Sequence, residues 1–161
     1  MSYCLDEIVV IYNHMTSPFS FDDYDNVIGF VVSQAGYRLS QALIKAIESL
    51  GSDLRPREFA VLNRLHERGE LTQIQLAELT YKDKPAITRM LDRLIERGLV
   101  RKVASSADRR AMVVSLTAEG EALRNAIAPL IVQFLEEACE GISSDDLAVT
   151  VATLRRISER V

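Results

Sequence analysis

The sequence predicts a mainly helical α+β fold, in which two short helices and a β-hairpin lie between longer amphipathic helices. Apolar residues recur every three or four positions over most of the 161 residues, which is the periodicity of amphipathic helices. Capping residues and glycines divide this pattern into short segments between residues 51 and 98. Two valine-rich stretches separated by a polar run follow at residues 99–116 and indicate the hairpin. Hydrophobic residues make up 48% of the chain, enough for a core without metal or disulfide support.

A long first helix is predicted over residues 24–50, where the apolar stripe is continuous. Its length exceeds what a small core requires, so we expect it to pack against a partner chain. Residues 51–53, Gly-Ser-Asp, end this helix, and Pro56 suits the first turn of a second one. The second helix extends to Gly69 and carries an apolar face formed by Phe59, Leu62 and Leu65.

Two short helices joined by a tight turn are predicted next. Thr72 and Gln75 form a capping box, in which the two side chains satisfy free backbone N–H groups at the start of a helix. Asp83 caps the following helix, which has Pro85 in its first turn and ends at Gly98. The inward face of that helix is formed by Ile87, Leu91, Leu94 and Ile95. This pair of helices predicts a helix-turn-helix.

The hairpin is predicted from strands at residues 99–104 and 112–116, with the polar residues 105–110 at its tip. Its position directly after the helix-turn-helix makes it a wing. Two further helices are predicted after the wing. Thr117 caps the first, in which Pro129 predicts a kink because proline removes one helical hydrogen bond, and Ser143 opens the second.

Charge is distributed unevenly along the chain. The net charge is −4, but residues 82–110 contain nine basic and four acidic side chains, a net charge of +5, so the rest of the chain carries −9. A basic segment within an acidic protein is expected when one surface faces phosphate. The segment coincides with the fourth helix and the wing, which favours DNA binding over the alternative that these are solvated charges on an ordinary surface.

The fourth helix has the properties of a recognition helix. With its apolar stripe turned inward, its polar residues face solvent, where the N-terminal half of the helix could enter a major groove. Arginine reads guanine bidentately, threonine can contact a base or a thymine methyl, and arginine at the wing tip suits a narrow minor groove. The predicted DNA contacts are Lys82, Lys84, Pro85, Thr88, Arg89, Arg93, Ser105, Asp108, Arg109 and Arg110.

Residues 71–120, LTQIQLAELTYKDKPAITRMLDRLIERGLVRKVASSADRRAMVVSLTAEG, resemble the MarR family of winged helix-turn-helix transcriptional regulators. The family signature is a D-x-R wing, a hydrophobic strand and L-T-x-x-G, matched here by Asp108, Arg110, Leu116, Thr117 and Gly120. The likeness extends over the helix from about residue 24 and over the last two helices.

The resemblance implies a homodimeric repressor that binds a pseudo-palindromic operator in double-stranded DNA. Residues 1–50 and 117–161 would form an intertwined dimerisation domain, and residues 51–116 would read the DNA. Two recognition helices would occupy successive major grooves, and Arg110 would enter the minor groove. Ligand binding would then act by altering the spacing of the two recognition helices.

The resemblance also implies an effector, either a small anionic aromatic ligand or oxidation of a cysteine. For an anion pocket, the candidate donors are Tyr37, Arg38, Arg57 and His66. A redox-responsive regulator using Cys4 or Cys139 remains an alternative, as does a protein-interaction module whose basic face meets an acidic partner. We expect a homodimer with no cofactor. We also expect no metal site, because the two histidines, His14 and His66, lie far apart in the chain.

Other function classes are disfavoured. The sequence has none of the nucleophile-elbow, phosphate-loop or H-E-x-x-H motifs of common enzymes, so we expect no catalytic activity. The apolar stretch at residues 8–12 is too short to cross a membrane and follows acidic residues, so we expect neither a membrane partner nor a signal peptide. The two cysteines form no disulfide pattern, and a cytoplasmic location is expected.

Overall fold

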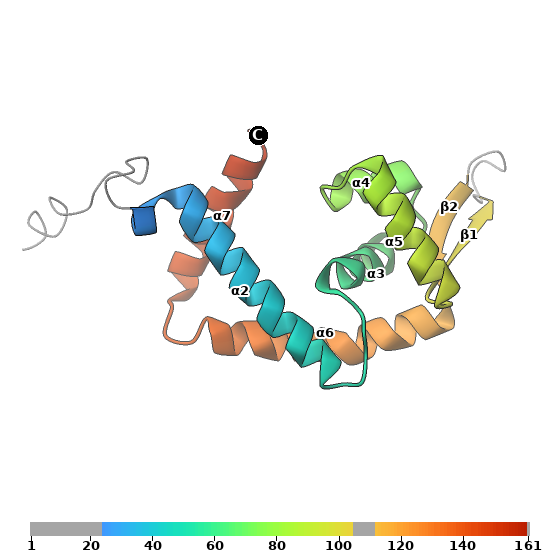
Figure 1. Cartoon of the computed structure of the whole chain (residues 1–161), viewed down its shortest axis with the longest axis horizontal. Coiled ribbons are helices and arrows are strands. Elements are labelled where there is room, and N and C mark those ends of the chain that lie inside the picture. The colour runs from blue at the N-terminus through green and yellow to red at the C-terminus, as the bar shows by residue number, and fades with distance from the viewer. Residues whose placement is uncertain (1–23, 105–111, 161) are drawn as a thin grey trace, which may run out of the picture. The chain divides into compact units, whose positions relative to one another are not determined.

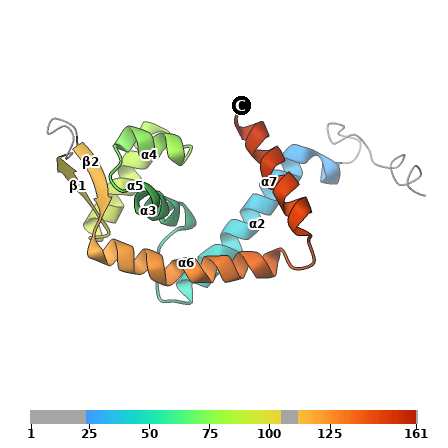
Figure 2. The ribbon, with the colours of Figure 1, turned by 180° about the vertical axis from the view of Figure 1, so that it is seen from behind.

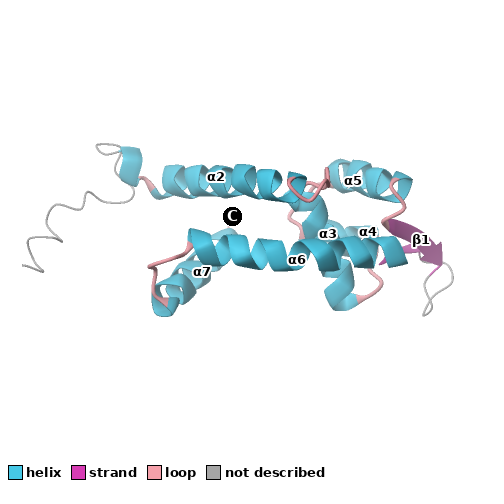
Figure 3. Cartoon of the chain, turned by 90° about the horizontal axis from the view of Figure 1, so that it is seen from below, coloured by secondary structure: helices cyan, strands magenta, loops and turns pink. Residues whose placement is uncertain are grey.

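The computed structural model describes residues 24–104 and 112–160, which fall into two compact units, one ending at Lys45 and the other beginning at Ala46 (Figure 1). The first unit contains the 3-10 turn η1 and most of helix α2. The elements in chain order are η1 (Tyr24–Asn26), α2 (Ile28–Glu48), α3 (Pro56–Arg68), α4 (Gln73–Leu79), α5 (Lys84–Glu96), β1 (Val100–Ala104), β2 (Met112–Leu116), α6 (Ala118–Ala138) and α7 (Ser144–Ser158). Helices account for nearly all of this regular structure (Figure 3).

The predicted helix boundaries are largely confirmed because local signals set them. Thr72 accepts a hydrogen bond from the N–H of Gln75, which completes the predicted capping box at the start of α4. Asp83 accepts from the N–H of Ala86 at 2.7 Å and caps α5. The first long helix is shorter than predicted, because a 3-10 turn precedes it and the α-helix begins at Ile28.

The core of the second unit forms where the apolar faces of α3, α4 and α5 meet. Leu62, Leu76, Ile87, Leu91 and Leu94 are fully buried. Each buried side chain of this size contributes about 1.5–3 kcal/mol relative to an exposed one. The three helices are therefore held as one body, with α5 fixed on its inner face.

The wing is an antiparallel pair of strands in which Val100 lies opposite Leu116 and Ala104 opposite Met112. Leu71 extends the pairing through two backbone hydrogen bonds with Val114, of 3.1 and 2.8 Å. The loop before α4 is thereby attached to the wing. The tip of the hairpin, with the predicted contacts Ser105, Asp108, Arg109 and Arg110, lies outside the described residues.

The first turn of α6 is attached to the base of the wing by close backbone contact. The hydroxyl of Thr117 donates to the carbonyl of Gly98 at 2.6 Å and accepts from the N–H of Gly120 at 3.0 Å. Gly120 is buried, and a Cβ atom there would overlap the carbonyl oxygen of Leu99. This gives a physical reason for a threonine and a glycine three positions apart.

Helix α6 continues through Pro129 without interruption for 21 residues. Figure 2 shows it starting below β2 and extending past α3. The buried residues of α6, Gly120 and Ile127, both lie in its first half. Among the described residues, α7 has no buried side chain. No helix in the described ranges is long and apolar enough to span a bilayer.

Candidate nucleic-acid interface

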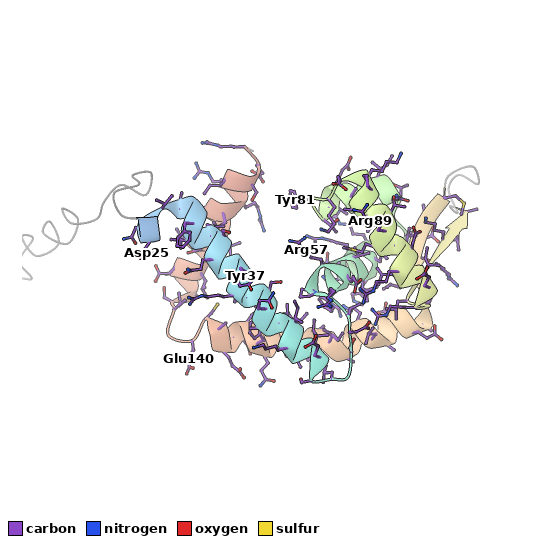
Figure 4. The ribbon with its side chains drawn as sticks, in the orientation of Figure 1. Asp25, Tyr37, Arg57, Tyr81, Arg89 and Glu140 are labelled. Atoms are coloured by element: carbon purple, nitrogen blue, oxygen red, sulfur yellow. The ribbon has the colours of Figure 1, made fainter. Side chains whose placement is uncertain are left out.

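Helix α5 presents the outer face that the sequence predicted for a recognition helix. Ile87, Leu91 and Leu94 are fully buried, whereas Lys84, Pro85 and Arg89 are exposed. Figure 4 shows Arg89 among the side chains of α5. The exposed residues of the C-terminal half, Asp92 and Glu96, are acidic, so the N-terminal half is the end of α5 that suits the major groove of DNA.

The turn between α4 and α5 depends on Tyr81, whose φ of 52° lies in the left-handed region. This conformation is uncommon outside glycine and asparagine, and it reverses the chain within a short turn. The Tyr81 side chain is 81% exposed. Lys82 follows it, half-buried, with its N–H bonded to the carbonyl of Ala77 at 3.0 Å.

Thr88 is less available than the sequence predicted. Its hydroxyl donates to the carbonyl of Lys84 at 2.8 Å and accepts a hydrogen bond from the side-chain amide of Gln73. The methyl group is therefore the part of Thr88 left for contact with a base. Sequence reasoning missed Gln73, which starts α4 and is brought to the recognition helix by the fold.

The predicted outward orientation of Arg93 needs correction. Its Nη2 lies 3.0 Å from Asp53 Oδ2 and its Nε lies 3.3 Å from Glu58 Oε1. Arg97 binds the same two carboxylates, at 2.6 Å from Asp53 and 3.7 Å from Glu58. Both arginines are turned toward α3 and its preceding loop, so we leave Arg93 out of the proposed interface.

These four side chains form the ion cluster Asp53–Glu58–Arg93–Arg97, which joins α5 to the start of α3. Glu58 is only 4% exposed and also accepts the N–H of Arg55 at 2.9 Å. Sequence analysis missed this buried carboxylate, although its signal was present: Glu58 lies four and seven positions before Leu62 and Leu65, on their helix face. A carboxylate on an apolar face indicates a buried cationic partner.

Two of the four candidate ligand donors, Arg57 and His66, lie on opposite faces of one helix. Arg57 and His66 both lie on α3, but nine residues separate them, which places them about 180° apart around the helix. His66 Nδ1 lies 2.6 Å from Glu121 Oε1 on α6. Tyr37 and Arg38 are exposed on α2, in the other compact unit.

Arg57 instead lines a hollow of about 460 Å³ between α3 and the end of α4. In Figure 4, Arg57 and Tyr81 both extend to the side of this unit that is away from the hairpin. The other lining residues are Ala60, Arg64, Leu79, Thr80 and Lys82.

The structure adds little to the redox and metal alternatives. Cys139 is a half-buried free thiol at the C-terminal end of α6, and Cys4 lies outside the described residues. Within residues 24–104 and 112–160, no three histidine, cysteine, aspartate or glutamate side chains gather as metal ligands would.

Comparison with known proteins identifies the family. The model of the MarR family matches residues 54–112, which span α3 to the start of β2. The transcriptional regulator HosA of Escherichia coli is 31% identical over 105 residues, covering 65% of this chain and 78% of HosA. The chain belongs to the MarR family. As a MarR-family protein it is a transcriptional regulator with a winged helix-turn-helix, which confirms the fold and function expected from the sequence.

Solved structures of MarR-family proteins share this architecture. CouR of Rhodococcus jostii, bound to p-coumaroyl-CoA, superposes with a TM-score of 0.74 and 31% identity, covering 81% of this chain and 90% of CouR. A mutant MarR of Escherichia coli, complexed with operator DNA, gives a TM-score of 0.73 and 25% identity, covering 84% and 97%. The similarity therefore includes the helices outside the winged part.

Proposed function

We propose that this MarR-family protein is a homodimeric repressor that binds a pseudo-palindromic operator, with α5 of each subunit in a major groove. The observation that carries the proposal is α5 itself, whose inner face is fully buried while Lys84, Pro85 and Arg89 are exposed at its N-terminal half. The DNA-bound state of the related MarR supports the same role. Repression follows from occupancy of a promoter, with no catalytic step.

The proposed contacts fall into two classes. Arg89, with Pro85 and the methyl of Thr88, would read base edges, whereas Lys82 and Lys84 would bind phosphates near the positive end of the helix. Within the described ranges, no carboxylate lies within ion-pair distance of Arg89, Lys82 or Lys84, so their charges are available for DNA. On the strength of the family resemblance, the wing arginines Arg109 and Arg110 complete the interface.

Arg89→Ala is expected to weaken binding to the specific operator by about 1–3 kcal/mol and to relax the base preference at one position of each half-site. Fluorescence anisotropy with the operator, with single-base variants and with random DNA measures both effects. Arg68→Ala, at an exposed position of α3 outside the basic segment, is the matched control. An equal loss for operator and random DNA would show that Arg89 binds only phosphate.

Dimerisation is proposed from apolar surface that the subunit leaves exposed. In α7, Leu147, Val151, Leu154 and Ile157 recur at spacings of three and four; Val151 and Ile157 are 54% and 40% exposed, and the helix has no buried residue in the described chain. An amphipathic helix of this kind requires a partner for its apolar face. A second copy supplies a self-complementary partner and also the second recognition helix that a pseudo-palindrome requires.

Val151→Asp is expected to weaken the dimer about 100-fold or more, because an unpaired carboxylate in an apolar interface costs several kcal/mol. Sedimentation equilibrium measures the dimer constant. Ala152→Asp carries the same charge about 100° further around α7 and should have a smaller effect. Equal effects of the two substitutions would place the interface elsewhere.

The test of the whole proposal is selection of bound duplexes from a random DNA pool at physiological salt with competitor DNA. A pseudo-palindrome with half-sites about 34 Å apart is the expected result. If a folded dimer enriched no motif, the basic face would serve an acidic protein partner instead.

A further inference from the structure

Thr88 lies on the flank of α5 that meets α4, and its hydroxyl group takes part in two hydrogen bonds. The hydroxyl donates to the backbone carbonyl of Lys84 at 2.8 Å and accepts from the side-chain amide of Gln73. A hydroxyl carries one proton, and here the backbone carbonyl takes it. Thr88 therefore cannot donate a hydrogen bond to a base while this arrangement holds.

Gln73 reaches this hydroxyl from the first position of α4. Because the hydroxyl can only accept from it, the amide nitrogen Nε2 faces Thr88 and the oxygen Oε1 faces away. Among the residues that the structure describes, the Gln73 side chain has no other hydrogen-bond partner. The chain just before α4 is held to the wing by the backbone bonds between Leu71 and Val114, so Gln73 extends from a fixed backbone.

The bond from Gln73 selects one orientation of the Thr88 side chain. Threonine in a helix has two common χ1 rotamers, because its hydroxyl can reach a carbonyl of the preceding turn in either of them. The two rotamers differ in the direction of the methyl group. Gln73 can bond the hydroxyl in only one position, and the net gain from one neutral hydrogen bond corresponds to a preference of about two- to tenfold.

This pair of side chains lies at the edge of the surface proposed to face DNA. Gln73 and Lys84 both line a hollow of about 580 Å³ between α4 and the start of α5. Thr88 is half-buried, and it precedes the exposed Arg89. A methyl group held on this surface suits thymine, because thymine presents a methyl group of its own in the major groove.

We propose that Gln73 is a positioning residue for base recognition, which holds the methyl group of Thr88 toward the major groove and gives each half-site a preference for thymine at one position. The proposal deepens the function proposed above and rests on it. It assigns part of the operator preference to a residue outside the recognition helix. Gln73 acts through Thr88 and contacts no base itself.

The orientation of Thr88 is tested first, in the full-length protein without DNA. Three-bond NMR couplings from its methyl carbon to the backbone nitrogen and carbonyl carbon measure χ1. We expect one dominant rotamer in the wild type and averaging of two in Gln73→Met, which keeps the side-chain size but cannot donate. Gln133→Met is the matched control, because Gln133 also donates one side-chain hydrogen bond, to Glu137 on α6. Equal couplings in all three proteins would overturn the proposal.

Deoxyuridine then locates the thymine, because it lacks only the C5 methyl group. Each thymine of the selected operator is replaced in turn, and fluorescence anisotropy measures the affinity. At one position in each half-site we expect the wild type to lose about fourfold, the effect of one buried methyl group, and Thr88→Ser to lose nothing. The absence of such a position would also overturn the proposal.

The role of Gln73 is tested at that position. Gln73→Met is expected to reduce the response to deoxyuridine to about twofold or less, because the second rotamer becomes populated, whereas Gln133→Met should keep the full response. Thr88→Val is the decisive background, because valine places a methyl group at both positions that the threonine methyl can occupy. In that background, the response to deoxyuridine should no longer depend on Gln73. A merely structural effect of Gln73→Met would weaken binding to every sequence and would persist with Thr88→Val.

The outcomes separate this inference from the function on which it rests. If Gln73→Met keeps the wild-type response to deoxyuridine, or changes the preference at a different base pair, the protein still reads an operator but Gln73 does not act through Thr88. If the wild type selects no DNA sequence, the regulator proposal fails and base recognition by Thr88 fails with it. Averaged couplings in Gln73→Met would even then establish that Gln73 orients Thr88.

Discussion

Gly120→Ala is expected to lower the free energy of unfolding by at least about 3 kcal/mol, at the upper end of the cost of overpacking. A Cβ atom at Gly120 would overlap a backbone carbonyl, that of Leu99, which cannot rotate away as a side chain could. Leu99 is itself fixed on both sides, because its N–H donates to Leu94 at 2.9 Å and its carbonyl accepts from Thr117 at 3.2 Å. The overlap between the new methyl group and this carbonyl can therefore be relieved only if the whole first turn of α6 moves.

Chemical denaturation of the dimer at fixed concentration measures the loss. Gly141→Ala is the matched control, because Gly141 has a φ of 80° but open space around the new methyl group. It should cost only the backbone strain of about 1–2 kcal/mol. A Gly120→Ala protein as stable as Gly141→Ala would show that α6 adjusts freely at the wing.

Glu58→Gln is expected to cost about 2–4 kcal/mol of stability, because it leaves two arginines without their buried counter-charge. The amide oxygen can still accept the N–H of Arg55, so the loss reports the ion cluster and not the helix start. Arg97 is the most affected partner. Its Nη1 is buried without a hydrogen bond among the described residues and lies 3.7 Å from Glu58 Oε2.

Asp53→Asn removes a charge from the same cluster at an exposed site and serves as the control. The Asp53 side chain is 70% exposed, so we expect a change within about 1 kcal/mol. Thermal and urea denaturation compare the variants, and the double variant Glu58→Gln with Arg97→Met should be less destabilised than the sum of the singles. Additive losses would contradict a direct interaction between the two side chains.

The helices and the wing could be predicted from sequence because each is set by residues close in the chain. Thr72 with Gln75 and Asp83 with Ala86 act over three positions, and the apolar stripe of α5 repeats within one helix. These signals depend only on residues close in sequence, so they can be recognised without knowledge of the tertiary structure. The same is true of the exposed position of Arg89 opposite that stripe.

The contacts that redefine the candidate site join residues far apart in sequence. Arg93 reaches Asp53 across 40 positions, and Gln73 reaches Thr88 across 15. Periodicity places Arg93 at the edge of the outer face, but the length of its side chain lets it turn toward a carboxylate on another helix. No local sequence pattern determines the direction in which the Arg93 side chain turns. Likewise, no local pattern predicts the hollow at Arg57, whose lining comes from two different helices.

The attachment of α6 to the wing has a mechanical consequence for DNA binding. Because Thr117 and Gly120 fix its first turn, α6 is a rod whose 21 residues extend about 31 Å from the winged unit. If α6 tilts by about 5° relative to the wing, its far end moves by roughly 3 Å. Conversely, if the far end of α6 is held in place and shifted by that distance, the wing tilts by the same angle. In the proposed dimer, the angle at this backbone contact would govern the distance between the two recognition helices, and we expect the methyl group of Gly120→Ala to change that angle.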